Sequence, residues 1–483
     1  MKIIAALVAA TVVAVPAAGA YRNPTPGRAL ALQIPRMHLA KVRRNVVYRR
    51  SPRLRMDVYR PRAGRGRLPA VLLGGPPGFG KDSAQKMGWA QLIAASGMAA
   101  VAFDIRSDGV LQSPSDPSHD VAAAIAYTRA HARKLGIDGR RLCTLGFSIG
   151  TAPWHLWATM RDPKPWLRCN VVYYGPLDFQ TIDPALGQEF SALTYLRTNP
   201  SGIPPMLIVK AGRDENPGIN DSIDRFAAAA RDLHADIRVV TNAPAKHGFD
   251  LGPRTARTRA IMRETLRFLR ARLASPLRVR DTCASRAERA ASLRFFAVDD
   301  TPLVGVELGS GPVGIALAHG YQGSLCDWLP YARQLASDGY RVLAYDARSD
   351  IRVDLDAEAA VGALYRAGSQ RVVVVGSSLG ALAAIVAGAS LPQTPAAVVS
   401  LSAPDSFGPI DGLAAARRLH APVLFAAAQD DLTFAEAARS LFAVAGSPDQ
   451  QLRILPGAAH GVDLLQDGSF RAFVWSFVAA HTR

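Results

Sequence analysis

Two serines of the chain stand in the same short pattern, Gly-x-Ser-x-Gly. Ser148 lies within residues 146–150 and Ser378 within residues 376–380. Each pattern follows an apolar run typical of a strand and opens a segment of small residues typical of a helix. A sharp turn there strains the serine backbone, and the flanking glycines let strand and helix approach closely. The pattern predicts two nucleophilic serines; the alternative for each is a Gly/Ser turn without chemistry.

A serine hydroxyl needs a base at neutral pH, and a histidine base needs a carboxylate to orient it. After a turn of this kind, the acid and the base follow the serine in that order, on loops after later strands. In the first half, Asp214 is followed 33 residues later by His247. Asp214 is the predicted acid, with Glu215 as the alternative.

The second half repeats this order with a less certain acid. Asp430 and Asp431 end a strand-like run, and His460 follows Asp431 by 29 residues. We expect Asp431 to be the acid, with Asp430 as the alternative. For His247 and His460 alike, the other interpretation is an ordinary loop histidine. The spacing therefore predicts one Ser-Asp-His set in each half.

Ester or amide chemistry at a serine also needs two backbone N–H groups that face the developing oxyanion. One comes from the residue after the nucleophile, which is Ile149 in the first half and Leu379 in the second. The other comes from the loop after the first core strand, where Tyr321 is the expected donor in the second half. His319, nearby in that loop, is expected to be structural.

The first half departs from this expectation in its corresponding loop. The position that matches Tyr321 is Pro76, which has no N–H to donate. Either the loop shifts register so that Gly78 or Phe79 donates, or this oxyanion hole is weak.

The elements that position these residues occur twice along the chain. SGMAAVAFDIRSD around Gly97 matches DGYRVLAYDARSD around Gly339 at a constant offset of 242 residues. A repeat this long corresponds to a whole domain. Each copy alternates apolar strand-like runs with helix-length segments, which indicates parallel strands covered on both faces. The predicted strands are 70–73, 99–103, 141–145, 170–174 and 206–210, then 313–318, 341–345, 371–375, 397–401 and 422–426.

We therefore expect two α/β domains, at residues 21–274 and 293–483. A closing helix over 254–274, with Met262 and Leu266 in its apolar stripe, ends the first domain, and residues 275–292 form a linker.

Four segments of the first half resemble the dienelactone-hydrolase and esterase branch of the α/β-hydrolase superfamily. They are LRMDVYRP (54–61), GIDGRRLCTLGFS (136–148), YYGPLDF (173–179) and HGFD (247–250). The resemblance covers residues 55–274 and 293–483. It implies a mostly parallel, twisted, eight-stranded sheet with helices on both faces in each half, and hydrolysis through an acyl-enzyme. It places the nucleophile, acid and base on Ser148, Asp214 and His247, and on Ser378, Asp431 and His460.

The resemblance also bears on the substrate. Dienelactone hydrolases proper use a cysteine nucleophile, so the two serines favour ordinary carboxylic esters of small molecules. The inserts at 180–203 and 405–420 are too short for a large lid, which suits open sites. The alternatives are peptidase or acyltransferase chemistry on the same residues, or one half acting as a non-catalytic binding or stabilising domain. No cofactor, metal or nucleic acid is implied, and the oligomeric state is left open.

The first twenty residues and the cysteines bear on the compartment. Lys2, an apolar run and the small residues Ala18-Gly19-Ala20 form a pattern typical of a secretory signal cleaved before Tyr21. We therefore expect export to the periplasm or the medium. Cys143 and Cys169 lie in apolar strands and are expected to be buried free thiols, whereas Cys283 and Cys326 could form a disulfide.

The net charge of +18, from 57 Lys and Arg against 39 Asp and Glu, is unevenly distributed. Residues 21–68 hold 14 basic residues and one acidic residue, and residues 251–290 hold 11 basic and three acidic ones. The predicted catalytic segments are not basic, which argues against nucleic-acid binding. Solvated surface is one explanation of the charge; the other is contact with an anionic envelope surface or with the acidic second domain.

Overall fold

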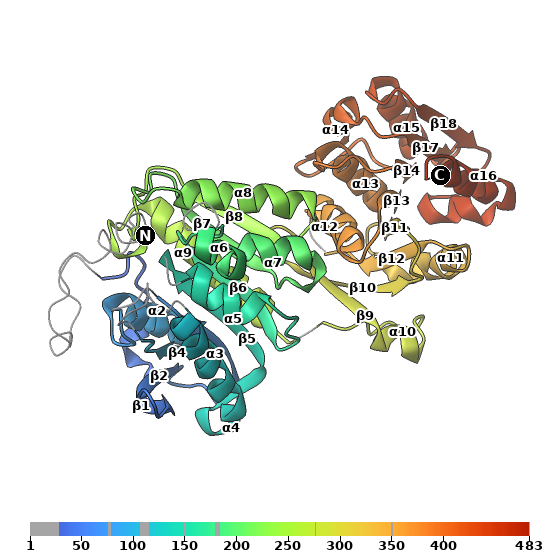
Figure 1. Cartoon of the computed structure of the whole chain (residues 1–483). Helices are drawn as coiled ribbons and strands as arrows, with labels where there is room; N and C mark the ends of the chain where they lie inside the picture. Colours follow the sequence, from blue (N-terminus) through green and yellow to red (C-terminus); the bar gives the residue numbers. More distant parts are fainter. Residues whose placement is uncertain are drawn as a thin grey trace. The chain divides into compact units, whose positions relative to one another are not determined.

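The computed structural model describes residues 29–75, 79–106, 115–148, 151–178, 184–275, 277–348 and 351–482, with the side chains of 151–153 and 184–186 left aside. The chain divides into two compact units, Met1–Ala274 and Ser275–Arg483, which we call unit 1 and unit 2 (Figure 1). Each unit is described by itself.

Unit 1 is built on an eight-stranded sheet with the order β1-β2-β4-β3-β5-β6-β7-β8. The pairs β1–β2 and β2–β4 are antiparallel and the others are parallel. The central strands are apolar on both faces, so both faces must be covered. The strands are β1 (Lys41–Arg49), β2 (Leu54–Arg60), β3 (Leu68–Leu73), β4 (Ala99–Phe103), β5 (Ile137–Phe147), β6 (Leu167–Tyr173), β7 (Met206–Ala211) and β8 (Ile237–Asn242).

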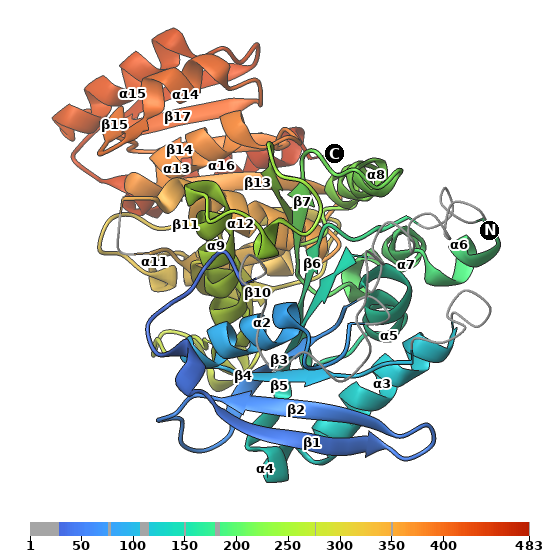
Figure 2. The ribbon, with the colours of Figure 1, turned by 90° about the vertical axis from the view of Figure 1, so that its left-hand side faces the viewer.

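Helices cover the two faces of this sheet (Figure 2). Residues of α3, α5, α7 and α8 share one buried core with the sheet, and those of α2 and α9 share the other. The apolar stripe predicted for the closing helix is confirmed, since Met262 and Leu266 of α9 are buried. The helices are α2 (Ala84–Ala95), α3 (Ser115–Ala130), α4 (Ala132–Leu135), α5 (Trp157–Met160), α6 (Pro184–Phe190), α7 (Ala192–Thr198), α8 (Ile219–Asp232) and α9 (Ala256–Leu273).

Unit 2 repeats the sheet, with the order β18-β17-β14-β13-β11-β12-β10-β9. The strands are β9 (Ser292–Phe296), β10 (Pro302–Leu308), β11 (Val313–Ala318), β12 (Arg341–Asp346), β13 (Arg371–Ser377), β14 (Ala397–Leu401), β17 (Val423–Ala428) and β18 (Gln450–Leu455). A separate small hairpin joins β15 (Ser406–Phe407) to β16 (Ile410–Asp411). The predicted fold class, two domains with mostly parallel sheets and helices on both faces, is confirmed.

The helices of unit 2 also form two layers. Residues of α11 and α16 pack on one face of the sheet, and those of α12 to α15 pack on the other. The helices are α10 (Arg286–Ala290), α11 (Leu325–Ser337), α12 (Val353–Arg366), α13 (Leu379–Ser390), α14 (Gly412–Arg418), α15 (Leu432–Val444) and α16 (Gly468–Ala480). The segment 275–292, predicted as a linker, packs on unit 2, because Val279 and Ala284 are buried in its core.

Both pairs of cysteines form disulfides. Cys283 and Cys326 are joined, as the sequence allowed. The expectation of free thiols at Cys143 and Cys169 is wrong, because these residues face each other on the adjacent strands β5 and β6 and are also joined. A strand-like run reveals that a cysteine is buried, but it does not reveal which residue of another strand lies opposite.

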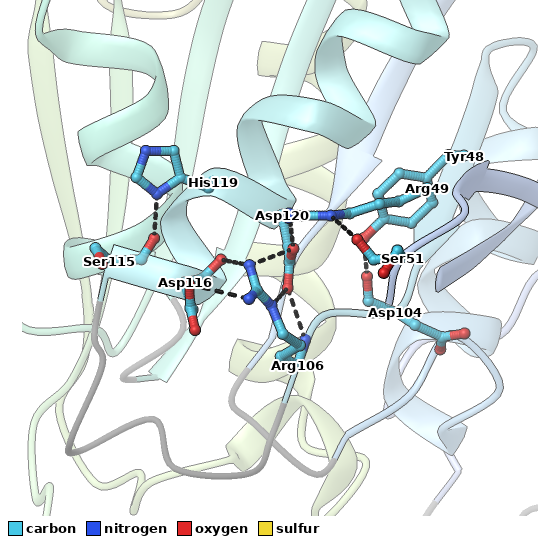
Figure 3. Close-up of polar contacts among 9 residues, drawn as sticks. All are labelled: Tyr48, Arg49, Ser51, Asp104, Arg106, Ser115, Asp116, His119 and Asp120. Atoms are coloured by element: carbon cyan, nitrogen blue, oxygen red, sulfur yellow. Dashed lines mark hydrogen bonds and ion pairs between the residues drawn. The ribbon is translucent and has the colours of Figure 1, made fainter. Parts of the chain in front are cut away.

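A buried carboxylate fixes the start of the loop after β4 (Figure 3). Asp120 of α3 is inaccessible to solvent and accepts the backbone N–H and the Nε–H of Arg106, both at 2.9 Å. Arg49 of β1 approaches its other oxygen at 2.5 Å. Asp116 is more exposed and pairs with Arg106 at 2.9 Å. One carboxylate thus joins the edge strand, α3 and the end of β4.

Unit 2 keeps the central Arg–Asp pair but has a third member of the opposite charge. Arg348, the counterpart of Arg106, donates its backbone N–H and its Nε–H to buried Asp356, at 2.7 and 2.8 Å. The third member comes from the turn between β9 and β10, and it is the acid Asp299, 2.6 Å from Arg348 Nη1. The edge hairpin thus adds an arginine to the pair in unit 1 and an acid to the pair in unit 2.

Within the described ranges, no helix is both long and apolar enough to cross a membrane. The same residues contain no group of three or more His, Cys, Asp or Glu side chains that could hold a metal ion.

Replacing Asp120 by Asn should destabilise unit 1 by about 2–3 kcal/mol, because two arginines lose the charge that they share. Urea-dependent hydrogen exchange, followed on peptides of unit 1, measures this loss separately from unit 2. Asp116→Asn is the matched control. The Asp116 side chain is 44% exposed, so its loss should cost less than about 1 kcal/mol. Equal losses of stability in the two variants would contradict this role of Asp120.

Candidate active site

The candidate residues of unit 1 lie on loops at the carboxyl edge of the parallel strands. Ser148 follows the central strand β5, Asp214 follows β7, and His247 follows the edge strand β8. Because these ends share one edge of the sheet, residues distant in sequence come together. Ser148 has φ 55°, in the left-handed region, and its side chain is buried. The sharp turn predicted from the glycine pattern is present.

Two hydrogen bonds connect these three side chains. His247 Nε2 lies 2.8 Å from Ser148 Oγ, and His247 Nδ1 lies 2.7 Å from Asp214 Oδ2. The other oxygen of Asp214 accepts the backbone and side-chain N–H groups of Asn216, both at 3.0 Å. Glu215, the alternative acid, points instead to Lys246 at the surface. The carboxylate that orients the histidine is therefore Asp214.

The histidine loop of unit 1 is held by a residue that the sequence did not single out. Asp250, three residues after His247 and fully buried, accepts hydrogen bonds from Gln85 and Trp89 of α2, both at 2.9 Å. It also accepts one from the hydroxyl of Tyr174. The Tyr174 ring lies 4.6 Å from that of His247, so one carboxylate fixes both the loop and the ring beside the histidine. Asp250 is the last residue of the HGFD segment (247–250), so the sequence did contain a signal for this residue.

The serine of unit 2 occupies the same kind of turn. Ser378 follows β13 and has φ 54°. A methyl group at Gly376 would lie 2.1 Å from the carbonyl oxygen of Gly380, and one at Gly380 would lie 2.3 Å from that of Ala318. Only glycine fits at these positions, which explains the pattern physically.

In unit 2, the acid and the base are hydrogen-bonded to each other, whereas no hydrogen bond between the base and the serine is found among the described residues. His460 Nδ1 lies 2.7 Å from Asp431 Oδ2, whereas Asp430 faces solvent. Among the hydrogen bonds of the described residues, none joins Ser378 Oγ to His460. The His460 side chain is 39% exposed, against 14% for His247. The site of unit 2 is therefore the more open of the two.

Two serines hold the histidine loop of unit 2. Ser402 Oγ accepts the N–H of Gly461 at 3.0 Å, and Ser377 Oγ accepts the N–H of Val462 at 2.9 Å. Ser402 follows the strand beside β13 and has φ 53°, as Tyr174 follows the strand beside β5 with φ 37°. In both units, a strained residue at this position supports the histidine loop.

The described residues include only some of those predicted to donate an N–H group to the oxyanion. Ile149 and Gly78 lie outside the described residues, whereas Phe79 lies in the loop before α2. Leu379 is the first residue of α13, so its N–H has no acceptor inside the helix. Tyr321 follows Gly320, whose added methyl group would lie 3.0 Å from Ser378 Cβ. The loop of Tyr321 therefore lies beside the serine.

His319 has a structural place, as expected. Its Nε2 accepts the N–H of Ala347 at 2.9 Å, and its Nδ1 lies 2.7 Å from the carbonyl oxygen of Gly320. It thus ties the loop after β11 to the end of β12.

In unit 1, two buried basic side chains pack against the loop that follows β3. The sequence did not single out either of them. His155, at the end of the π-helical segment Thr151–Leu156, lies where a side chain of Gly74 would otherwise be. Burial lowers its pKa to about 3, so the ring is neutral. Lys86 packs beside Gly75 and donates to the carbonyl oxygen of Phe103 at 2.9 Å, and burial lowers its pKa to about 8. At Gly74, only glycine leaves room for the neighbouring side chain, since an added methyl group would lie 1.5 Å from His155 Nε2.

Gly461→Ala should displace the loop that carries His460. Gly461 has φ 60°, and an added methyl group would lie 2.2 Å from Ser377 Oγ, so the substitution adds a clash to backbone strain. We expect faster amide hydrogen exchange across residues 457–466. Gly457→Ala is the matched control, since Gly457 has φ 85° but open space around it. If both variants exchange alike, the contact with Ser377 does not hold the loop.

Comparisons with known proteins match the two units separately. Residues 56–165 match the BD-FAE family model, and residues 331–468 match that of the dienelactone hydrolase family. No curated protein gives a significant match.

Solved structures similar to the chain include three esterases. Esterase 2 of Thermogutta terrifontis is 23% identical over 44% of this chain and 85% of its own, with a TM-score of 0.38. A Pyrococcus furiosus esterase is 20% identical over 43% and 99%, with a TM-score of 0.36. A thermostable esterase from Pseudomonas putida is 18% identical over 49% and 83%, with a TM-score of 0.40.

The two family matches fall in different units, and each unit has the sheet order and the strained serine described above. The chain is an α/β-hydrolase superfamily protein with two hydrolase-like regions.

Proposed function

We propose that the protein hydrolyses carboxylic esters of small molecules through a serine nucleophile in each unit. One observation carries the proposal: the hydrogen-bonded series Asp214–His247–Ser148, with distances of 2.7 and 2.8 Å, at a strained turn. A serine in contact with a histidine that is itself held by a carboxylate is equipped for acyl transfer. The match of residues 331–468 to the dienelactone hydrolase family model agrees with this chemistry.

In the first step, Ser148 Oγ attacks the ester carbonyl carbon while His247 Nε2 takes the hydroxyl proton. Asp214 keeps His247 Nδ1 protonated and stabilises the imidazolium that forms. The tetrahedral intermediate collapses, the carbon–oxygen bond to the alcohol breaks, and the alcohol leaves with the proton held by His247. The acyl group remains on Ser148 as an ester.

In the second step, a water molecule gives a proton to His247 and attacks the acyl-enzyme carbonyl. Collapse of this intermediate releases the carboxylic acid and returns the proton to Ser148 Oγ. In both steps, negative charge develops on the carbonyl oxygen, for which Ile149 and either Gly78 or Phe79 are the proposed N–H donors.

In unit 2, we assign the same roles to Ser378, His460 and Asp431, with the N–H groups of Leu379 and Tyr321 as oxyanion donors. The pairing of Asp431 with His460 supports the assignment of the acid. The reaction there requires His460 Nε2 to come within hydrogen-bond distance of Ser378 Oγ when substrate binds. Open geometry before substrate binding is common in catalytic sites.

Fluorophosphonate labelling of the intact chain tests these roles, because the reagent bonds covalently to an activated serine. We expect two labelled serines in the wild type, loss of one in Ser148→Ala, loss of the other in Ser378→Ala, and none in the double variant. In the Ser378→Ala background, Asp214→Asn should lower kcat for p-nitrophenyl acetate by about 10⁴-fold.

Glu215→Gln in the same background is the matched control and should stay within about twofold, since Glu215 pairs with Lys246 away from the histidine. Absence of labelling in the wild type would overturn the serine mechanism. Labelling that one single substitution abolishes completely would leave one working unit and a second, non-catalytic one.

We further propose that the chain is exported and contacts an anionic envelope surface. The signal-like pattern of residues 1–20 and the disulfides Cys143–Cys169 and Cys283–Cys326 support export, because disulfides persist in oxidising compartments. Exposed Lys41, Arg43 and Arg44 on the edge strand β1 support the surface contact.

Fractionation of cells that produce the full chain tests both parts. We expect a product that begins at Tyr21, sediments with the envelope, and is released by about 0.5 M salt, which screens charge pairs. A variant with Arg43 and Arg44 changed to Gln should be released at lower salt. Recovery in the cytosol with residues 1–20 attached would contradict export, and salt-independent sedimentation would contradict the charge contact.

A further inference from the structure

Unit 2 exposes four large apolar side chains on its catalytic edge: Tyr321, Ile351, Phe407 and Leu432, which are 62%, 46%, 36% and 75% exposed. We call these four residues the apolar rim. They follow β11, β12, β14 and β17, strands that flank β13 on both sides in the sheet. Because β13 carries Ser378, the rim residues come from loops on both sides of the proposed nucleophile. Exposed apolar side chains gathered at one place mark a binding surface.

Contacts within the rim join loops that follow strands on opposite sides of β13. The rings of Tyr321 and Phe407 are 6.2 Å apart, although Tyr321 belongs to the loop on one side of β13 and Phe407 to the hairpin on the other. An added methyl group on Gly408 would lie 3.5 Å from Ile351. The β15–β16 hairpin thus reaches from β14 toward the loops after β11 and β12, and joins them in one apolar surface at the edge of the sheet that carries Ser378.

The opposite side of the opening is also apolar. Leu432 begins α15 directly after Asp431, and the ring of Phe434 lies 4.3 Å from that of His460. The basic residue beside the rim, Arg352, is paired with Asp354 at 3.0 Å. The described residues around Ser378 therefore suit a neutral apolar group.

The base of unit 2 is accessible from solvent, since the His460 side chain is 39% exposed. An accessible base beside exposed apolar side chains suits an ester whose long acyl chain lies along the surface.

We infer that unit 2 takes neutral esters with a long apolar acyl chain, which lies across the apolar rim. The inference rests on the proposed ester hydrolysis. Each methylene group of the acyl chain that leaves water for the rim strengthens binding, so a chain of about eight carbons should bind much better than an acetyl group.

Kinetics in the Ser148→Ala background isolate unit 2. We expect kcat/KM to rise at least about tenfold from p-nitrophenyl acetate to the octanoate, and Phe407→Ser or Ile351→Ser to lower the octanoate value about tenfold while acetate stays within about twofold. Leu277→Ser is the matched control: Leu277 is an apolar residue of unit 2 that is 41% exposed and lies outside the rim. It should change neither value.

Binding separates this inference from the proposed reaction. In the doubly inactive Ser148→Ala, Ser378→Ala chain, p-nitrophenyl octanoate should still bind, and Phe407→Ser should weaken that binding about tenfold. Rim-dependent binding without turnover in the Ser148→Ala chain would reject the reaction at Ser378 but keep the ligand class. Binding that is insensitive to the rim would overturn the inference. So would rim variants that change only the sedimentation mass, because the rim would then contact another copy of the chain.

Discussion

A close approach of backbone to backbone at the strand-to-helix turn decides the geometry of each site. In unit 2, the carbonyl oxygen of Ala318 occupies the space where any side chain at Gly380 would begin. The helix can therefore pack against the sheet only with glycine there, and the resulting turn holds Ser378 at a positive φ. The fold supplies this strain, since burial of α13 over the sheet more than compensates for one unfavourable residue.

The two units hold the loop of the histidine with different side chains at an equivalent position. In unit 1, an aromatic hydroxyl and the indole of Trp89 converge on Asp250, and this network leaves little of His247 accessible. In unit 2, two small hydroxyl side chains bind the backbone of the loop directly. The His460 side chain is also the more exposed of the two histidines.

Local signals in the sequence were sufficient for the strands, the sheet class and the two serines, because apolar periodicity and a glycine-flanked turn are properties of short segments. Spacing along the chain also reduced the candidates for the acid to two adjacent residues in each half. The choice between Asp430 and Asp431, however, depended on which of the two side chains the turn after β17 directs toward His460. The Cys143–Cys169 pairing depended on the register of two strands. The support of the histidine loops by Asp250 and Ser402 depended on contacts between segments distant in the sequence, which no local pattern encodes.

A tandem repeat is exposed to a particular folding error, in which one copy takes up an element of the other. In unit 1, the edge strand supplies Arg49 to the buried carboxylate of Asp120, whereas in unit 2 the turn after the edge strand supplies Asp299 to the guanidinium of Arg348. A hairpin taken from the other copy would leave each cluster without its own third member. The N-terminal hairpins of the two copies are therefore not interchangeable.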